Sequence, residues 1–506
     1  MIHLDGLSLT LEDLVAIADR FAPVALAPDA TRRIDASRDV VERYAASSEA
    51  VYGINTGFGA LAETAVPRDA LGALQLNLIR SHAAGVGAPL PVRIVRATMA
   101  LRANVLAKGY SGIRRTTVER LIALLNHRVH PRVPSRGSVG ASGDLAPLAH
   151  LALVLVGEGL ATVGDDERQL TGRDALAAVG LEPVVLEAKE GLALINGTQP
   201  STAIAALVNA GAWRLARVAD IAAALSIDAL RGSMRPFEAR IHAARPHAGQ
   251  TASAANIRRL LADSAINKSH EHCGRVQDAY SLRCAPQVHG ATRDAVDYAR
   301  RIVEIEANAA TDNPMVFADA GEIVSGGNFH GQPVALAADF LAAALVPLAT
   351  ISERRTARLV DPALSELPAF LTTNGGLQSG LMLAQVTAAA VASELKTIAH
   401  PAGVDTIPTS ANKEDHVSMS MAAALKAERA VGRAREVVAV EILCAAQAID
   451  LLAPLTTSPA LARAHALVRS RVPILDRDRA PSPDIAAIVE LLETGALENA
   501  CAGLVK

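Results

Sequence analysis

The residues whose types and spacing most clearly suit a chemical reaction lie in one short run, GSVGASGD at residues 137–144. Glycine has no Cβ and tolerates unusual dihedral angles, so the amide nitrogen of Gly143 can bend back onto the carbonyl carbon of Ala141. If that ring closes and two waters leave, Ser142 becomes an exocyclic methylene on an imidazolone. The run therefore predicts a strong electrophile made from the backbone. The alternative is a Ser/Gly loop in which Asp144 caps a helix that begins near Leu145.

A second candidate is Tyr52, which begins the glycine-rich run YGINTGFG at residues 52–59. The glycines let the backbone approach a ligand closely and leave the phenol at a loop tip. A phenol acts as a base when nearby positive charge or hydrogen-bond donors lower its pKa. The run lacks the Lys-Ser/Thr ending of a phosphate-binding loop. A tyrosine that packs a turn is the alternative.

A third candidate is the polar run QDAYSLRCAPQ at residues 277–287, which contains Gln277, Tyr280 and Arg283. The planar guanidinium of Arg283 matches the two oxygens of a carboxylate, so this run predicts a site for an α-carboxylate. A structural ion pair is the alternative.

Four further candidates are His82, in the run RSHAAGVG at residues 80–87, and Asn196, Phe329 and Glu414, which each precede an expected helix. Asn196 precedes the first long helix, and a helix cap would equally explain it. Phe329 lies in SGGNFHG, where a core phenylalanine is the alternative. Glu414 precedes the longest expected helix, where a carboxylate also favours the helix dipole.

The elements that must position these residues change in character along the chain. Residues 1–200 read as a mixed α/β portion that carries the Tyr52 loop and the electrophile. We interpret residues 201–506 as a long-helix bundle with substrate-binding segments, because apolar residues recur every three or four positions over long stretches without proline. The predicted fold is therefore mainly α. We expect extended segments at residues 24–26 and 184–186. We expect helices at residues 11–20, 32–48, 201–230, 293–309, 385–398 and 416–452.

The composition of the 506 residues excludes several classes of protein. Half of them are hydrophobic and only 3% are aromatic, which favours closely packed helices. A net charge of −3 gives no indication of nucleic acid or an anionic membrane as a partner. The most apolar window, 333–350, contains Pro347 and Asp339 and reads as a buried core helix. The four cysteines form no CxxC pair, which favours a reducing compartment. The N-terminus lacks the basic segment followed by an apolar segment that a signal peptide has, so we expect a cytoplasmic protein.

Two non-electrophile alternatives remain open at this point. One is a metal-dependent hydrolase that uses the histidines, since His270 and His272 lie two positions apart in the sequence. However, the histidines show no zinc-binding spacing, so no metal is expected. A non-catalytic helical scaffold would leave Ser142 intact.

Taken together, the motifs resemble the aromatic amino acid ammonia-lyase family along nearly the whole chain. The resemblance implies a 4-methylidene-imidazol-5-one formed from Ala141-Ser142-Gly143, with Asp144 assisting the cyclisation and no diffusible cofactor. It also implies that Tyr52 removes the substrate β-proton. The remaining residues implied in substrate binding are His82, Asn196, Gln277, Tyr280, Arg283, Phe329 and Glu414. The family is a homotetramer whose sites combine residues from several chains.

Two positions resemble the histidine-specific members of that family, namely the Ser-His pair that ends in His82 and the carboxylate Glu414. The resemblance then implies non-oxidative elimination of ammonia from L-histidine to give trans-urocanate, with a small amino acid as the only partner besides other subunits. Three positions depart from the usual pattern: Lys413, Leu395 and Gly403. They leave open a lyase or aminomutase that acts on phenylalanine or tyrosine.

Overall fold

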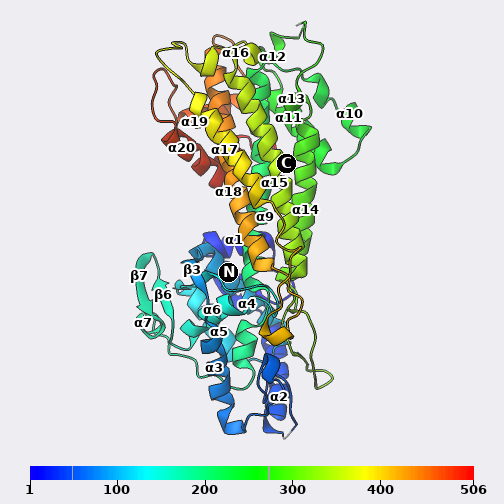
Figure 1. Ribbon diagram of the computed structural model, residues 1–506, viewed down its shortest axis with the longest axis vertical. Coiled ribbons are helices and arrows are strands. Elements are labelled where there is room, and N and C mark those ends of the chain that lie inside the picture. The colour runs from blue at the N-terminus through cyan, green and yellow to red at the C-terminus, as the bar shows by residue number, and fades with distance from the viewer. Residues whose placement is uncertain (48, 272–273) are drawn as a thin grey trace. The chain divides into compact units, whose positions relative to one another are not determined.

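The computed structural model describes residues 1–47, 49–271 and 274–506, and Figure 1 shows their arrangement as ribbons. The described residues are mainly helical, which confirms the predicted fold class. The chain forms two compact units that are each discontinuous in sequence. Unit 1 comprises residues 1–207, 300–339 and 401–425, and unit 2 comprises residues 208–299, 340–400 and 426–506. The domain boundary at residue 200 stays a prediction.

Unit 1 joins short strands to helices of moderate length. Its strands form four small sheets, in which β1 pairs parallel with β2, while β3–β5, β4–β6–β7 and β8–β9 are antiparallel. The strands are β1 (Ile2–Leu4), β2 (Val24–Leu26), β3 (Val86–Pro89), β4 (Val129–Pro131), β5 (Pro134–Arg136), β6 (Leu160–Val163), β7 (Asp166–Thr171), β8 (Met315–Phe317) and β9 (Glu322–Val324). The helices are α1 (Leu11–Asp19), α2 (Pro28–Ala46), α3 (Leu71–His82), α4 (Val92–Ala107), α5 (Arg115–Asn126), α6 (Leu145–Leu155), α7 (Gly172–Ala178) and α8 (Glu190–Ile195).

The centre of unit 1 is α4, which is buried on almost every face. A helix that is apolar on all sides is expected inside a core, yet α4 also buries the charged side chains Arg96 and Arg102. Helix α6 is similarly buried, and it begins directly after Asp144. The electrophile loop is therefore anchored to core helices and not to the surface.

Unit 2 contains most of the long helices: α9 (Gln199–Ala229), α14 (Ala285–Ala307), α15 (Gln332–Val360), α17 (Met382–Ile398) and α18 (Ser420–Leu451). Figure 1 shows them running side by side as a bundle, and side-chain hydrogen bonds link neighbours. Glu441 of α18 accepts from Ser226 of α9 and from Arg355 of α15, and Gln385 of α17 donates to Glu353 of α15. The alanine-rich faces let these helices approach closely.

Shorter helices complete the remainder of unit 2. They are α10 (Ala239–Ala243), α11 (Ala248–Leu261), α12 (Ala265–Lys268), α13 (Tyr280–Arg283), α16 (Pro362–Ser365), α19 (Pro459–Arg469), α20 (Ser482–Glu493) and α21 (Ala496–Ala500). The predicted bundle of long helices is thus present, with most of its length in this unit.

Several predicted element ends differ from the observed ones. Helix α2 begins at Pro28, four residues early, because proline is well placed in a first turn; Ser48, its predicted end, lies outside the described residues. Helix α18 begins at Ser420 and not at His416, since Met419 adopts a positive φ of 56°. The segment 184–186 pairs with no strand and is irregular. The strand at 24–26 is confirmed.

One described helix, α15, is long and apolar enough to cross a bilayer by length and composition alone. However, 56% of its most apolar window is buried within the chain, as expected for the predicted core helix. Cys284, Cys444 and Cys501 are free thiols, while Cys273 and His272 lie outside the described residues.

Candidate functional site

The loop that carries Ala141, Ser142 and Gly143 folds back on itself. Ala141 and Gly143 form an isolated antiparallel bridge, and Gly143 forms a second, parallel bridge with Gly197. Gly143 has a φ of 71°, and a Cβ added there would collide with the carbonyl of Gly197. Only glycine therefore fits at this position.

Asp144 does not serve as the simple helix cap that was the alternative interpretation of this loop. Although it precedes α6, its side chain makes no capping hydrogen bond. Instead, Oδ1 accepts from Ser138 Oγ at 2.6 Å and Oδ2 accepts from the Ser201 amide at 2.8 Å. Complete burial raises the pKa of this carboxyl, and the two hydrogen bonds offset part of the increase. Asp144 is thus a buried brace that ties both ends of the loop together.

A pocket of about 330 Å³ opens over this loop within unit 1. Its wall brings together six of the residues that the sequence predicted, from five separate segments of the chain: Tyr52, Ala141, Ser142, Asn196, Phe329 and Glu414. Gly143 and Asp144 lie in the same loop, one and two residues beyond Ser142. Residues distant in sequence therefore converge on the predicted electrophile.

Glu414 touches the reactive serine directly. Ser142 Oγ donates to Glu414 Oε1 at 3.0 Å, while Thr409 Oγ1 donates to Glu414 Oε2 at 2.5 Å. Backbone bonds between Thr409 and Glu414 close the intervening turn. Within it Ser410, Ala411 and Asn412 all have positive φ, between 50° and 65°. Left-handed backbone at three successive non-glycine residues stores strain, which is typical of functional turns.

Tyr52 lies in the pocket wall, but its electrostatic setting differs from the expected one. Burial raises the pKa of its phenol, and the negative charge of Glu414 raises it further, against a smaller lowering from a hydrogen bond to the Gly59 backbone. The Gly59 backbone is a donor of the kind that the sequence interpretation called for, but it does not offset the increase, and no positive charge from the described residues contributes. A phenol set in this way is a poor base until a cation approaches it.

His82 ends α3, and its tautomer is fixed by a neighbour. Its Nδ1 lies 2.8 Å from the Leu78 carbonyl, which can only accept, so Nδ1 carries the proton and Nε2 is left as an acceptor. Burial lowers the pKa of the ring, against a smaller rise from the Leu78 hydrogen bond and the charge of Glu414. His82 is therefore a neutral imidazole with one free acceptor nitrogen.

Asn196 follows α8 and presents a side chain with unmet hydrogen-bonding capacity. It is only 4% exposed, and its Oδ1 has no hydrogen-bond partner among the described residues. A buried amide oxygen without a partner is unfavourable by roughly 1–3 kcal/mol, so a donor on a bound molecule would be favoured there. The helix-cap alternative does not explain this oxygen.

Gln277, Tyr280 and Arg283 are not in the pocket wall and form their own cluster in unit 2. Arg283 Nη2 donates to Gln277 Oε1 at 2.9 Å, and its guanidinium carbon lies 4.7 Å from the centre of the Tyr280 ring. Gln277 and Arg283 line a different cavity, of about 500 Å³. No ion pair of Arg283 is found among the described residues. The structural ion pair that was the alternative for this arginine is thus not present there.

The sequence interpretation missed several polar residues of the pocket wall: Asn313, Ser325, His330, Ser410, Asp415 and His416. His330 Nε2 lies 3.2 Å from the His416 carbonyl, which links two of the wall segments. Asn313 stands in the polar run Thr311-Asp312-Asn313 before a proline, a signal that could have been used. Lys413 also lines the pocket, beside Glu414.

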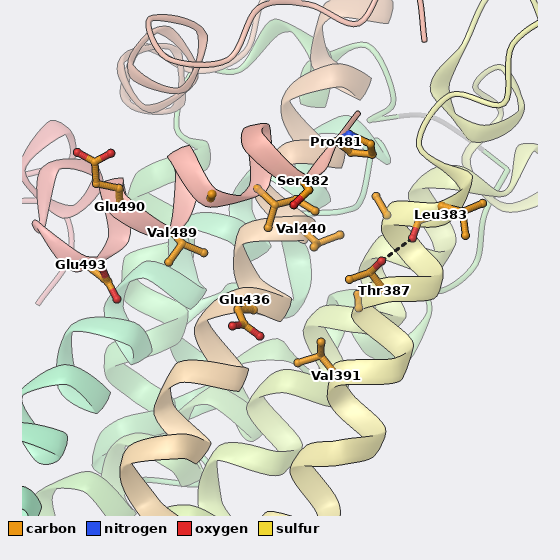
Figure 2. A pocket seen from close by; sticks show the side chains of 14 residues that line it. Leu383, Thr387, Val391, Glu436, Val440, Pro481, Ser482, Val489, Glu490 and Glu493 are labelled. Atoms are coloured by element: carbon orange, nitrogen blue, oxygen red, sulfur yellow. Dashed lines mark hydrogen bonds between the residues drawn. The ribbon is translucent and has the colours of Figure 1, made fainter. Parts of the chain in front are cut away.

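A further cavity, of about 560 Å³, lies in unit 2 between α17, α18 and α20 (Figure 2). Its lining is mostly aliphatic, and its three carboxylates are each paired with an arginine: Glu436 with Arg433, Glu490 with Arg471 and Glu493 with Arg435. None of the predicted site residues lines it. In the described parts of the chain, no group of three or more His, Cys, Asp or Glu side chains is arranged to hold a metal ion.

Comparison with known proteins agrees with this geometry. A sequence model of the aromatic amino acid lyase family matches residues 9–470. A histidine ammonia-lyase from Anaeromyxobacter sp. (strain K) is 57% identical, over 98% of this chain and 99% of that protein. The crystal structure of histidine ammonia-lyase from Trypanosoma cruzi superposes with a TM-score of 0.93 at 45% identity, covering 100% of this chain and 96% of that one.

A tyrosine aminomutase from Streptomyces globisporus is also similar, with a TM-score of 0.93 and 40% identity over 99% of this chain and 98% of that one. The fold, the folded-back triplet and the full-length matches define the class of protein. The chain belongs to the aromatic amino acid lyase family.

Proposed function

We propose that this protein eliminates ammonia from L-histidine without oxidation and releases trans-urocanate. The observation that carries the proposal is the hydrogen bond between Ser142 and Glu414, because it places a carboxylate beside the reactive triplet. A carboxylate accepts a hydrogen bond from an imidazole N–H, whereas a phenyl ring offers no such donor. The high identity to histidine ammonia-lyases over the whole chain supports the same substrate.

The residues present fit a methylidene-imidazolone formed from Ala141, Ser142 and Gly143. The bridge between Ala141 and Gly143 and the collision that any side chain at Gly143 would cause both favour a bent-back triplet. Such a group supplies an electrophilic carbon that makes the substrate ammonium a better leaving group or its β-proton more acidic. We propose it as the only cofactor, with no diffusible cofactor and no metal.

The side chains of the pocket wall then have separate tasks. Glu414 in the wall presents an acceptor to the imidazole ring of the substrate. His82 ends α3 and does not line the wall, but we propose that its Nε2 is a second acceptor for that ring. The unpartnered Oδ1 of Asn196 accepts from the substrate ammonium, and Phe329 closes the apolar side of the pocket. Asp144 holds the loop during cyclisation.

Tyr52 is the proposed base for the β-proton. Because the pKa of its phenol is raised, the site still requires a positive charge near this side chain. We propose a homotetramer whose sites combine residues from several chains, so that the Arg283 cluster completes a pocket. Arg283 binds the α-carboxylate, while Gln277 and Tyr280 order it. A guanidinium brought near Tyr52 in the assembly lowers the pKa of the phenol. Light scattering at micromolar concentration should give four times the chain mass; a monomer contradicts this arrangement.

A cytoplasmic location completes the proposal. It is supported by the free thiols of Cys284, Cys444 and Cys501, since disulfides are rare in reducing compartments.

A second candidate is an aminomutase or lyase that acts on tyrosine or phenylalanine. The similarity to tyrosine aminomutase at 40% identity favours it, as does the unusual Lys413 beside Glu414 in the wall. If the ammonium of Lys413 neutralises Glu414, the preference for an imidazole weakens.

One side-by-side assay separates the candidates. Initial rates are measured with L-histidine, L-phenylalanine and L-tyrosine at equal concentration, by the absorbance of the unsaturated acid, with β-amino acid products followed by chromatography. We expect urocanate from histidine to dominate. Faster turnover of either other substrate, or a β-amino acid as main product, contradicts the proposed function while leaving family membership unchanged.

A further inference from the structure

Arg102 is a buried cation in the middle of α4, and it touches the backbone on which the electrophile loop rests. We propose that Arg102 is a positioning residue for electrophile formation: it braces the Asn196–Gly197 segment against which Gly143 must bend. The inference rests on the proposed function, because it takes ring closure at Ala141-Ser142-Gly143 as given.

The contacts of Arg102 all lead to this segment. Its Nη1 donates to the Asn196 carbonyl at 2.6 Å and to Gln199 Oε1 at 2.7 Å, so a single nitrogen holds both sides of Gly197. Gln199 is held in turn, because its Nε2 donates to Thr311 Oγ1 at 2.7 Å. Hydrogen bonds from a charged donor are stronger than neutral ones, so this brace is stiff.

Gly197 is confined between the brace and the loop. A Cβ added at Gly197 would meet Gln199 Oε1 at 2.5 Å and Arg102 Nη1 at 2.7 Å. On the other side Gly143 lies against its backbone, and the Asp144 amide donates to the Gly197 carbonyl at 2.8 Å. The loop cannot relax away from its bent form unless Gly197 moves, and Gly197 cannot move unless Arg102 does.

Stability alone is a poor explanation of this side chain. Arg102 is fully buried, and its Nε and Nη2 have no hydrogen-bond partner among the described residues. Buried donors without partners are unfavourable, and an apolar side chain of similar volume would avoid them. Burial lowers the pKa of Arg102 to about 10, so it remains charged at neutral pH. A charged group is thus kept here despite an unfavourable environment.

One buried carboxylate, Asp312, supplies compensating negative charge, and it also pairs with a second cation. Lys189 Nζ lies 3.2 Å from Asp312 Oδ2, both are almost fully buried, and Asp312 also attracts Arg102. Asp312 leads directly to Asn313 in the pocket wall. The brace therefore belongs to the floor beneath the pocket and has no contact with its open side.

Arg96 offers a matched control on the same helix. It is buried to the same degree as Arg102, and burial lowers its pKa to about 10 as well. However, its hydrogen bonds go to the carbonyls of Ile17 and Leu125, away from the loop. An Arg→Gln change at either position removes the same buried charge from α4, but only the change at Arg102 releases Gly197.

The test is the intact mass of full-length wild type, R102Q, R96Q and R102K, each purified and checked for folding by circular dichroism. Ring closure and loss of the serine hydroxyl each remove one water, so a mature chain lacks two. We expect the two-water deficit in wild type and R96Q, its loss from most R102Q chains, and its recovery in R102K, which restores a cation. This readout reports maturation of the loop directly and needs no turnover.

Each result has a definite meaning. R102Q chains that lack two waters as fully as wild type overturn the proposal, as does an equal loss in R96Q, because the effect is then general to buried charge. Wild type at its full sequence mass overturns the electrophile itself, and with it the proposed function. If R102Q does not fold, Gln199→Leu replaces it, since this change removes one acceptor of Arg102 and leaves the charge; a complete two-water deficit in that variant overturns the brace.

Discussion

Two walls of the same pocket are built in opposite ways. The loop at residues 137–144 is held by packed backbone and by buried hydrogen bonds to Asp144, and its geometry depends on glycines. The turn at residues 409–416 is largely exposed, carries Lys413, Glu414 and Asp415, and has positive φ at three residues that are not glycine. One wall is shaped by the main chain and the other by side chains.

This difference separates two properties of the enzyme. Packed backbone has few alternative arrangements, so we propose that the first wall decides whether the electrophile forms. Exposed side chains can be exchanged with small structural consequence, so we propose that the second wall decides which substrate is favoured. Changes in the first wall should therefore abolish activity, whereas changes in the second should redistribute it.

The largest effect is expected for Ser142→Ala in the first wall. Alanine has no hydroxyl to lose, so no exocyclic methylene can form and turnover should fall to background. Ser142 is one polar side chain in a pocket, so the helical content in circular dichroism should not change. Substantial turnover by this variant would remove the electrophile from the mechanism.

The next effect is expected for Asp144→Ala. This change deletes the acceptor of both Ser138 and the Ser201 amide and leaves those buried donors unpaired, at roughly 1–3 kcal/mol each. The loop then loosens, and the fraction of chains that lack two waters should drop in an intact-mass spectrum. An unchanged fraction would show that the brace is unnecessary for cyclisation.

A smaller and more selective effect is expected for Glu414→Gln, in the second wall, combined with His82→Leu at the end of α3. The double variant loses the acceptor nitrogen of His82 and the negative charge of Glu414, leaving only a neutral amide oxygen at position 414. Lost hydrogen bonds of this kind amount to roughly 1–3 kcal/mol each, so kcat/KM for histidine should fall at least about tenfold. Residual phenylalanine turnover should fall far less, and the two-water deficit should persist. A parallel fall for both substrates would refute the division between the walls.

The smallest effect on the site is expected for His130→Phe, outside both walls. Burial and then the charges of Arg96 and Arg128 lower the pKa of His130 to about 4. The unfolded chain, with a histidine pKa near 6.5, binds more protons between these values. Stability should therefore fall as pH decreases from about 6.5 to 4, by on the order of 1–3 kcal/mol from this group.

Urea denaturation at several pH values checks this expectation. His130→Phe should flatten the decline in unfolding free energy over that window, whereas His127→Phe, at an exposed position, should not. Both variants should keep the wild-type mass deficit and substrate preference. An equally steep decline in His130→Phe contradicts the assignment.

The sequence predicted much of the first wall because its motif is local. Ala141, Ser142 and the glycines around them lie in one short run, so the run itself marks the loop. The collision that requires glycine at position 143 is with the distant Gly197 and could not be read from the run. The long helices were predicted for the same reason, since the apolar period is local and survives tertiary packing. The full-length similarity to aromatic amino acid lyases confirms the resemblance on which the remaining roles rested.

What the sequence could not predict depends on contacts between distant segments. Burial is the largest cause of the raised pKa of Tyr52, and the charge of Glu414, more than 360 positions later, adds to it. Thr409 holds Glu414 through a strained turn that no helix or strand pattern marks, and a positive φ at Met419 places the start of α18 at Ser420. Arg102 stands in an ordinary helical pattern, so only its buried contacts distinguish it.

The central claim is that this chain makes its own electrophile from residues 141–143. The most direct test is the mass of the purified wild-type protein, followed by digestion to find the peptide that contains these residues. The account predicts a deficit of two waters, located entirely in that peptide. A peptide at its full sequence mass, with an intact Ser142, would contradict it.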